Sequence, residues 1–215
     1  MSATTNEIIS GVSALSTLPV RSSLWSSLPT PDEFGVGLVF VSDVGVSGSL
    51  WYSNGTTWGL ANGSCLLFQT AVSVSVSATT SEEVLFSGTL PAGIMGINGA
   101  LRCSPIFTVT NSANTKTLRI RTGSTALGGS AWAANSITTQ ASQESIPIVW
   151  RNRGAVNSQI TYVAATGHIT TQSSTANTTH TEDTSVAMTF AITGQKVSAG
   201  ETITLEGFTL ELLRA

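Results

Sequence analysis

The chain carries little charge. Only 10% of its 215 residues are charged, and the net charge is −3, whereas about 25% is usual for a soluble protein. There are just two lysines, Lys116 and Lys196. The arginines that alternate along expected strands are Arg119, Arg121, Arg151 and Arg153. So few cations cannot follow a phosphate backbone, so the sequence predicts no nucleic-acid partner.

Long apolar runs and cysteines are also scarce. No stretch approaches the about 18 apolar residues of a membrane span, and the first 19 residues lack the basic start and apolar core of a signal peptide. We therefore expect neither membrane insertion nor export by the usual route. Cys65 and Cys103 lie in apolar strand-like runs; two buried free thiols are the simpler interpretation, although the sequence leaves a disulfide open.

Residues for catalysis are few. A histidine base could come only from His168 or His180, and both lie in a polar segment without an apolar pattern. His180 is near Glu182 and Asp183, but further metal ligands are missing. The carboxylates at or near expected strands are Glu144, Glu201, Glu206 and Glu211. Such residues fit a solvated strand face better than a catalytic pair. The sequence predicts no catalytic residue, no cofactor and no metal, hence no enzyme.

Serine, threonine and apolar residues are abundant instead. Serine and threonine make up more than a quarter of the chain, 41% is hydrophobic, and glycine occurs 20 times. This apolar content separates the chain from disordered proteins, and the β-branched threonines favour strands. A neutral, hydroxyl-rich surface gives little colloidal repulsion, so it suits a chain that functions in an assembly.

Residues 33–69 predict a small β-meander. Short apolar runs at 35–43, 49–53, 56–61 and 64–69 are separated by turn residues. Asn54 and Gly55 predict a type I′ hairpin turn with these two residues at its centre. Trp51 and Trp58 either fill the core of this small unit or line a sugar-binding face. Alternation puts Tyr52 on the opposite face from Trp51.

Residues 70–215 predict an antiparallel β-sandwich of the jelly-roll kind. Apolar and polar residues alternate strictly over Ala71 to Ala78, which indicates a half-buried strand. Further strand patterns follow at regular spacing, with turn residues between them and no convincing helix. Residues 167–184 lose the apolar pattern after Ile169 and predict a long exposed loop or a weak polar hairpin.

Residues 1–32 differ from the rest. Isolated apolar residues stand among serines and prolines, at Ile8, Ile9, Val12, Leu15, Leu18, Leu24 and Trp25. Ile8, Val12 and Leu15 have helical spacing, but the prolines exclude a long helix. We expect an extended segment that docks on the body of this chain, on a sister subunit or on a larger assembly.

Two stretches resemble appendage proteins of tailed bacteriophages. The first, a valine strand followed by Asp-x-Gly and two tryptophan strands, comprises Val41, Asp43, Gly45, Trp51, Ser53, Asn54, Gly55, Thr56 and Trp58. The second is similar to the β-sandwich domain of tail fibres and head fibres and comprises Pro91, Gly93, Asn98, Gly99, Asn111, Asn114, Lys116, Thr117, Arg119, Asn152, Arg153, Gly154, Gln159 and Leu205. The resemblance covers about residues 36–215.

This resemblance implies a homotrimer on a virion, with the meander as neck or adaptor. The hypothesis is a fibre that adheres to host-surface polysaccharide or protein and attaches to another virion protein through residues 1–32. The alternative is a capsid-decorating protein without a receptor role. Since function tends to sit on loops over a rigid scaffold, the loops at 123–136 and 167–184 are expected to bind the receptor. The residues expected to do so are Trp132, Asn135, His168, Asn177 and His180.

Overall fold

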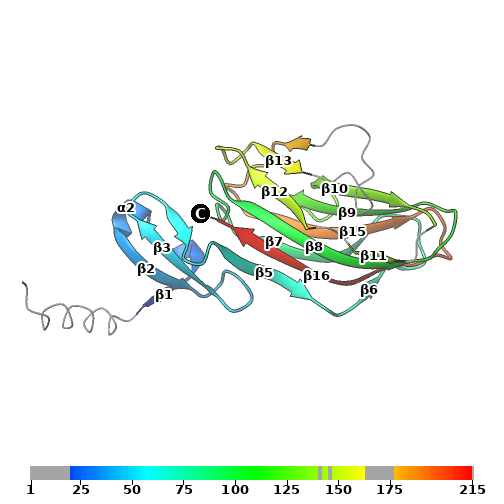
Figure 1. The fold of residues 1–215 in the computed structure, drawn as a ribbon, viewed down its shortest axis with the longest axis horizontal. Helices are drawn as coiled ribbons and strands as arrows, with labels where there is room; N and C mark the ends of the chain where they lie inside the picture. The colour runs from blue at the N-terminus through cyan, green and yellow to red at the C-terminus, as the bar shows by residue number, and fades with distance from the viewer. Residues whose placement is uncertain (1–19, 140–141, 145–146, 163–176, 215) are drawn as a thin grey trace, which may run out of the picture.

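The structure, a computed structural model, describes residues 20–139, 142–144, 147–162 and 177–214. Its elements are β1 (Arg21–Ser23), η1 (Trp25–Ser27), α2 (Pro31–Phe34), β2 (Val36–Val41), β3 (Ser49–Asn54), β4 (Trp58–Leu60), β5 (Ser64–Thr70), β6 (Val74–Ser75), β7 (Glu83–Leu90), β8 (Ala100–Val109), β9 (Lys116–Gly123), β10 (Ser130–Ile137), β11 (Ser142–Glu144), β12 (Ile148–Asn152), β13 (Gln159–Tyr162), β14 (Asn177–His180), β15 (Met188–Lys196) and β16 (Ile203–Leu213). A small sheet lies at one end of an elongated β-sandwich (Figure 1). The predicted all-β class is confirmed.

The small sheet has the strand order β1-β2-β3-β4. The pairs β2–β3 and β3–β4 are antiparallel, as a meander requires. Strand β1 adds to the edge in parallel, with Arg21 opposite Val39. After β1 come η1 and the one-turn helix α2, whose start Thr30 and Glu33 stabilise by a capping box. Residues 21–32, which the sequence predicted as part of an extended segment, therefore belong to the small sheet and its cover.

Tryptophans fill the core of this small unit. Trp51 and Trp58 are buried, whereas Tyr52 is exposed on the other face, which confirms the core interpretation of the two indoles. The ring of Trp25 lies 4.6 Å from that of Trp51, and the ring of Phe34 lies 4.9 Å from that of Trp58. Segments before β2 thus cover rings that a three-stranded meander would leave exposed.

The β3–β4 turn differs from the predicted one by one residue. The backbone N–H of Asn54 donates to the carbonyl of Thr57 at 3.4 Å, so Gly55 and Thr56 are the central residues. Gly55 has φ +84°, which glycine adopts without steric cost. The Asn54 side chain accepts hydrogen bonds from the backbone N–H groups of Thr56 and Thr57 at 2.9 and 2.8 Å. Asn54 thus caps the turn from its flank.

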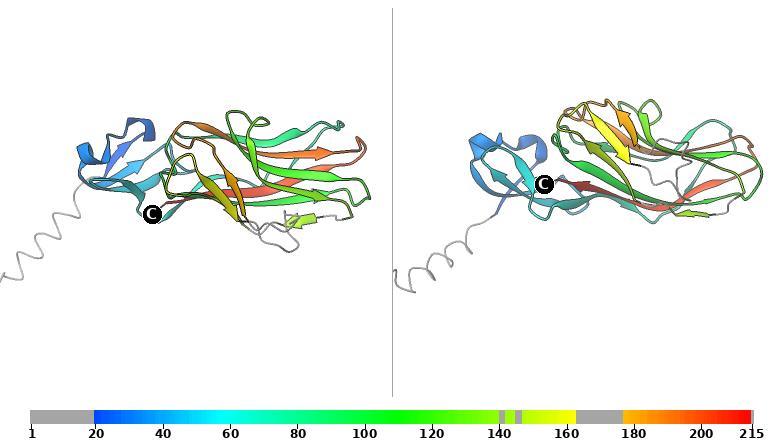
Figure 2. Two further views of the ribbon diagram at one scale, coloured as in Figure 1. Left: turned by 90° about the horizontal axis from the view of Figure 1, so that it is seen from above. Right: turned by 45° about the horizontal axis from the view of Figure 1, so that its top comes forward.

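The sandwich consists of two facing sheets. One has the order β10-β9-β15-β7; the other has the order β14-β13-β12-β8-β16-β5, with β11 on β8 and β6 on β16. Every pair within both sheets is antiparallel. The two layers are seen most clearly from above (Figure 2). Alternate side chains of long strands fill the space between them, among them Ile120, Phe190 and Leu210.

Two strands are placed differently from the sequence prediction. Strand β5, expected as the fourth meander strand, pairs with β16 in the large sheet, where the Phe68 ring packs against Phe86 and Phe190. Strict alternation over Ala71–Ala78 yields only the two-residue strand β6. Val72 and Val74 are exposed there and Val76 is buried. Of the three valines in this edge segment only one is buried, so the half-buried strand that the alternation predicted does not form.

A cationic side chain joins the two parts. The Arg214 guanidinium lies 5.5 Å from the Trp25 ring centroid and 5.1 Å from that of Trp51, and it donates to the Ile94 carbonyl at 2.7 Å. The Trp25 indole N–H donates to the Ala92 carbonyl at 2.8 Å. Burial lowers the pKa of Arg214 to about 10. These contacts fix the small sheet against the β7–β8 connection of the sandwich.

Candidate functional site

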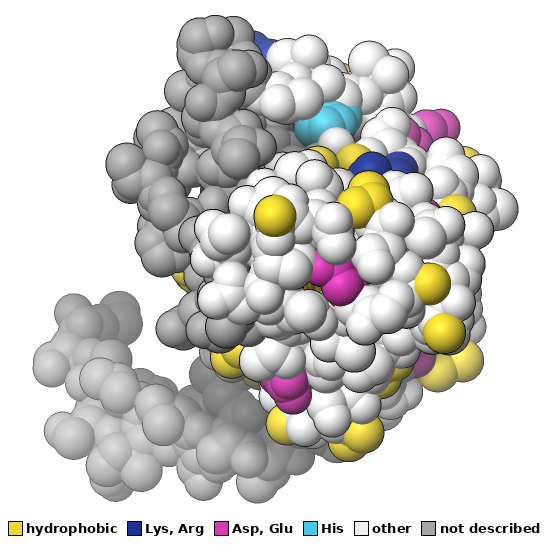
Figure 3. Space-filling view, turned by 90° about the vertical axis from the view of Figure 1, so that its right-hand side faces the viewer, with side chains coloured by type: hydrophobic (Ala, Val, Ile, Leu, Met, Phe, Trp, Pro, Cys, Tyr) yellow, Lys and Arg dark blue, Asp and Glu magenta, His cyan; other side chains and the backbone are white. Residues whose placement is uncertain are grey.

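The end of the sandwich opposite the small sheet collects four connections. Strand directions in Figure 1 bring together the segments after β6, after β8, after β10 and after β15. We call this surface the distal tip; its exposed residues include Thr80, Ser81, Asn111, Ala113, Asn114, Thr138, Val197 and Ala199. Figure 3 views this end, where neutral side chains and backbone predominate. None of the named residues is charged, and only a few acidic side chains stand out on this face in Figure 3, so hydrogen bonds and shape would dominate recognition here.

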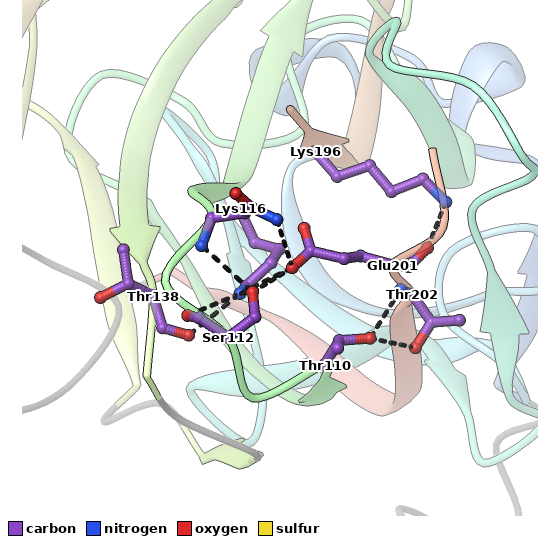
Figure 4. Close-up of polar contacts among 8 residues, drawn as sticks. Thr110, Ser112, Lys116, Thr138, Lys196, Glu201 and Thr202 are labelled. Carbon is purple, nitrogen blue, oxygen red and sulfur yellow. Dashed lines mark hydrogen bonds and ion pairs between the residues drawn. The ribbon is translucent and has the colours of Figure 1, made fainter. Parts of the chain in front are cut away.

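A buried charge cluster holds the distal tip together (Figure 4). Lys116 is fully buried, and its ammonium donates to the Ser112 hydroxyl and to the Thr138 carbonyl, both at 3.0 Å. The same ammonium lies 3.7 Å from Oε1 of Glu201. The Lys196 ammonium, also buried, donates to the backbone carbonyl of Glu201. Both lysines of the chain are thus used internally, and three of the four tip connections are linked.

The Glu201 carboxylate is the centre of this cluster. Its Oε1 accepts a hydrogen bond from the Ser112 hydroxyl and one from the Asn114 amide at 3.3 Å. The Ser112 hydrogen bond lowers the pKa of Glu201, with further lowering from Asn114 and Lys116 against the opposing effect of burial. The carboxylate is therefore ionised at neutral pH and paired, which makes it a structural anion. We find no arrangement here that would abstract a proton from a ligand.

Buried amides fix the connections at the opposite end of the sandwich. The Asn152 amide donates to the Thr184 hydroxyl at 2.8 Å. The Gln159 amide donates to Asn152 Oδ1 at 3.0 Å and to the carbonyls of Val156 and Glu182 at 2.9 Å. Sequence analysis associated Asn152 and Gln159 with the fibre resemblance, but it missed that they bind each other. The two residues lie directly opposite each other in the β12–β13 hairpin, and only the register of this hairpin reveals the contact.

Two predicted receptor residues are buried. Trp132 lies in β10 in the core, stacked on Trp150 of the opposite sheet with ring centroids 5.7 Å apart. The prediction that Trp132 belongs to a receptor loop is wrong, because residues 130–137 form a strand. His180 is buried in β14, where its Nε2 lies 3.0 Å from the Thr161 hydroxyl. Burial lowers the pKa of His180, so the neutral ring serves packing.

The other predicted site residues lie in strands or outside the described residues. Asn135 is part of β10, opposite Leu118, and Asn177 begins β14, opposite Tyr162. His168 lies outside the described residues, as do the anchor residues Ile8, Ile9, Val12, Leu15 and Leu18. Of the remaining anchor residues, Leu24 is exposed. Trp25 is half-buried and packs against Trp51 of its own chain.

Two arginines of the β9 strand share one carboxylate. Arg119 and Arg121 both pair with Glu82, at 3.1 and 2.9 Å. Burial acts to raise the pKa of Glu82, but hydrogen bonds from Arg121 and Thr193 and the two positive charges lower it overall. Within the described ranges no cluster of histidine, cysteine and acidic residues is suited to a metal ion. Cys65 and Cys103 are free thiols.

Two hollows of about 360 Å³ each lie away from the distal tip. One lies on the outer face of the large sheet, where the pairing of β16 with β8 shifts its register, beside Ile106 and Phe208. Its carboxylate, Glu206, accepts a hydrogen bond from Thr108. The other lies next to the small sheet, beside Phe40, Val46 and Leu66. Neither contains the paired carboxylates that sugar hydrolysis requires.

Comparisons with known proteins give distant likenesses only. No family model matches the chain, and no curated protein matches its sequence. A structure described as the CBM2 module of the Lactobacillus casei BL23 phage J-1 evolved Dit is similar at 15% identity and a TM-score of 0.33, over 73% of this chain and 78% of that one. The infectious bursal disease virus VP2 subviral particle is similar at 8% identity and a TM-score of 0.33, over 78% of this chain and 43% of that one.

At these TM-scores we transfer nothing from either protein to this chain. Among the described residues, no helix has the length and apolar character needed to cross a bilayer.

Proposed function

We propose that the chain is a structural protein of a bacteriophage virion, a homotrimeric fibre or appendage that adheres to the host surface with its distal tip. The fibre-like residue order of the small sheet and sandwich motivates the proposal. The observation that carries it is that the two ends of the molecule are built differently. The small sheet with the N-terminal side of the chain occupies one end, and four connections gather at the other (Figure 1).

The distal tip has the properties expected of a surface that binds a ligand. Buried Lys116, Lys196 and Glu201 fix its connections, so that exposed side chains such as Asn111 and Asn114 keep their positions. Preorganised loops lose less entropy on binding than mobile ones. A tip with few charges suits hydroxyl-rich or amide-rich ligands, such as host polysaccharide or protein. Each contact would be weak, and three copies would raise the total affinity by avidity.

A competition experiment tests adhesion. Purified protein is mixed with phage and host cells, and the fraction of adsorbed phage is measured. We expect the native chain to compete, the distal variant Asn111→Arg/Val197→Arg to compete at least about tenfold less, and the control Val186→Arg, exposed on the β14–β15 connection, to match the native chain. No competition by the native chain at saturating concentration contradicts adhesion.

The location of the protein on the particle decides between the two virion roles. We propose attachment to another virion protein through the N-terminal segment, narrowed to residues 1–19 because residues 21–34 belong to the small sheet. Labelled antibody against the chain should mark the tail in electron micrographs. Labelling of the capsid together with failed competition favours the alternative, a decorating protein without receptor binding.

A further inference from the structure

The small sheet is apolar on both faces. In β2 the side chains of Val36, Leu38 and Phe40 point away from the tryptophan core, because they alternate with the buried residues Val39 and Val41. On β3, Tyr52 lies opposite Leu38 and Leu50 lies opposite Phe40. Val36, Leu38, Phe40 and Tyr52 are exposed on this face. We call it the outer face of the small sheet.

Two glycines make this face flat. A Cβ at Gly59 would lie 2.5 Å from the Tyr52 ring, and one at Gly48 would lie 2.3 Å from the Phe40 ring. Both rings therefore rest on backbone instead of projecting into solvent. Beside Phe40 and Leu50 the face continues into the hollow of about 360 Å³ that Val46 and Leu66 also line. The apolar face thus borders a recess whose lining also includes Ser47, Asn62 and Ser64.

The size of this surface limits what can cover it. Exposed fractions are 85% for Val36, 48% for Leu38 and 36% for both Phe40 and Tyr52. Together these side chains expose on the order of 400 Å², within the range of functional patches on monomers. Because an interface is about 56–65% apolar, a contact built around them would bury about 600–700 Å² per copy, near the 800 Å² per partner of a standard interface.

The charge pattern favours a second copy of the chain as the occupant. Strands β2, β3 and β4 carry no charged residue. In a rotationally symmetric contact near the axis, equivalent residues approach one another, so any charge would meet its own copy and repel it. The face also lies at the opposite end from the distal tip (Figure 1), so association here leaves all tips free.

We propose that the outer face of the small sheet, which carries Val36, Leu38 and Tyr52, is the surface through which copies of this chain associate. This inference rests on the proposed homotrimer and assigns it an interface. The isolated protomer then exposes an apolar sheet face that is buried only in the assembly, and the tryptophan core on the other side keeps each protomer folded by itself.

Sedimentation of the full chain at micromolar concentration tests the proposal. We expect the native chain to sediment as an oligomer and Val36→Asp/Leu38→Asp as a monomer. These side chains are exposed in the protomer, so circular dichroism and thermal unfolding should show the variant folded. The controls Val72→Asp and Ile106→Asp carry the same change at exposed sites on the sandwich and should stay oligomeric.

Further variants keep the test decisive if the double aspartate variant does not fold. In a Cys65→Ser background, Val36→Cys should form a disulfide-linked dimer on oxidation, whereas Val72→Cys should not. Deletion of residues 1–19 should leave the oligomer intact. A monomer after that deletion would mean that residues 1–19, and not the outer face, hold the copies together, and it would overturn the proposal. The proposal is also overturned by an oligomer that survives Val36→Asp/Leu38→Asp, or by a native chain that is monomeric.

The outcome is separable from the proposed function. If particle labelling or host competition fails while the native chain is an oligomer that Val36→Asp/Leu38→Asp dissociates, adhesion is wrong and the interface stands. If labelling and competition succeed but the aspartate variant stays oligomeric, the interface is wrong and the virion role stands.

Discussion

Glu201 holds the charge that compensates the buried Lys116. Removal of one partner from a buried pair leaves the other charge unpaired in the interior, which costs about 3–5 kcal/mol. We expect Glu201→Gln to lower the free energy of unfolding by about 3 kcal/mol in denaturant titrations. The control Glu211→Gln removes the partner of the part-exposed Arg102 and should change it by about 1 kcal/mol or less. Equal effects of the two variants would contradict the role assigned to Glu201.

The same carboxylate predicts a pH dependence. The folded-state pKa of Glu201 lies below the ordinary value of 4.5, so the folded state holds this proton less tightly than the unfolded chain. Its contribution to stability is therefore fully present above about pH 4.5 and is lost as the pH falls through the folded-state pKa. Between neutral and acidic pH, the native chain should lose more unfolding free energy than Glu201→Gln. Parallel pH profiles for the two proteins would exclude Glu201 as a source of acid sensitivity.

Trp132 belongs to the core and not to a binding loop. Trp132→Ala removes a buried ring that stacks on Trp150, so we expect a loss of about 3–5 kcal/mol in unfolding free energy. At a temperature where the variant stays folded, it should compete with phage as the native chain does. Leu127→Ala, an exposed position on the same β9–β10 hairpin, should change stability by no more than about 0.5 kcal/mol. A stable Trp132→Ala variant that no longer competes would restore the residue to the binding surface.

Alternation predicted single residues well only where the run was long and unambiguous. It put Trp51 and Tyr52 on opposite faces of one strand, because strand side chains have a period of two, and the structure shows that Trp51 is the buried one. Trp132 stands in a run of small residues without an apolar pattern, and its burial comes from Trp150 on the opposite sheet. The cluster of Lys116 and Glu201 is equally nonlocal, because its members lie in different connections. Such contacts carry no local signal in the sequence.

At the scale of elements, the junction of Trp25, Trp51 and Arg214 determines whether the small sheet and the sandwich unfold together. We expect Trp25→Ala to lower stability by about 2 kcal/mol, since a half-buried ring costs less than a core ring. The segment between β4 and β5 should also become sensitive to protease, because small sheet and sandwich lose contacts there. Leu24→Ala changes the neighbouring, exposed residue and is the control. It should have the melting temperature and the protease resistance of the native chain. If Trp25→Ala behaves in the same way, Trp25 does not hold the junction.

The elements themselves were easier to predict than their partners. Strands β2, β3, β8, β9 and β16 follow from their apolar periods and turn residues. The pairing of β5 with β16 and the parallel addition of β1 to β2 do not. The apolar run of β5 could bury its side chains in either sheet, and only the complete core decides between them. The three residues of β1 are Arg, Ser and Ser, so they carry no apolar pattern that would predict a strand. Alternation at Ala71–Ala78 predicted a longer strand than β6, because the residues of an edge segment can alternate although no second sheet covers them.

At the scale of the whole molecule, the proposed function assigns adhesion to one end and attachment to the other, and the structure narrows the deletion that can test the attachment. Deletion of residues 1–32 would remove β1 and Trp25 and so disturb the small sheet. Deletion of residues 1–19 leaves every described contact in place. We expect the shorter deletion to melt like the native chain and to retain host competition, but to be absent from particles assembled without the native copy. Immunoblots of purified particles measure this. Incorporation at the native level would place the anchor elsewhere, whereas a destabilised deletion variant would mean that residues 1–19 support the fold.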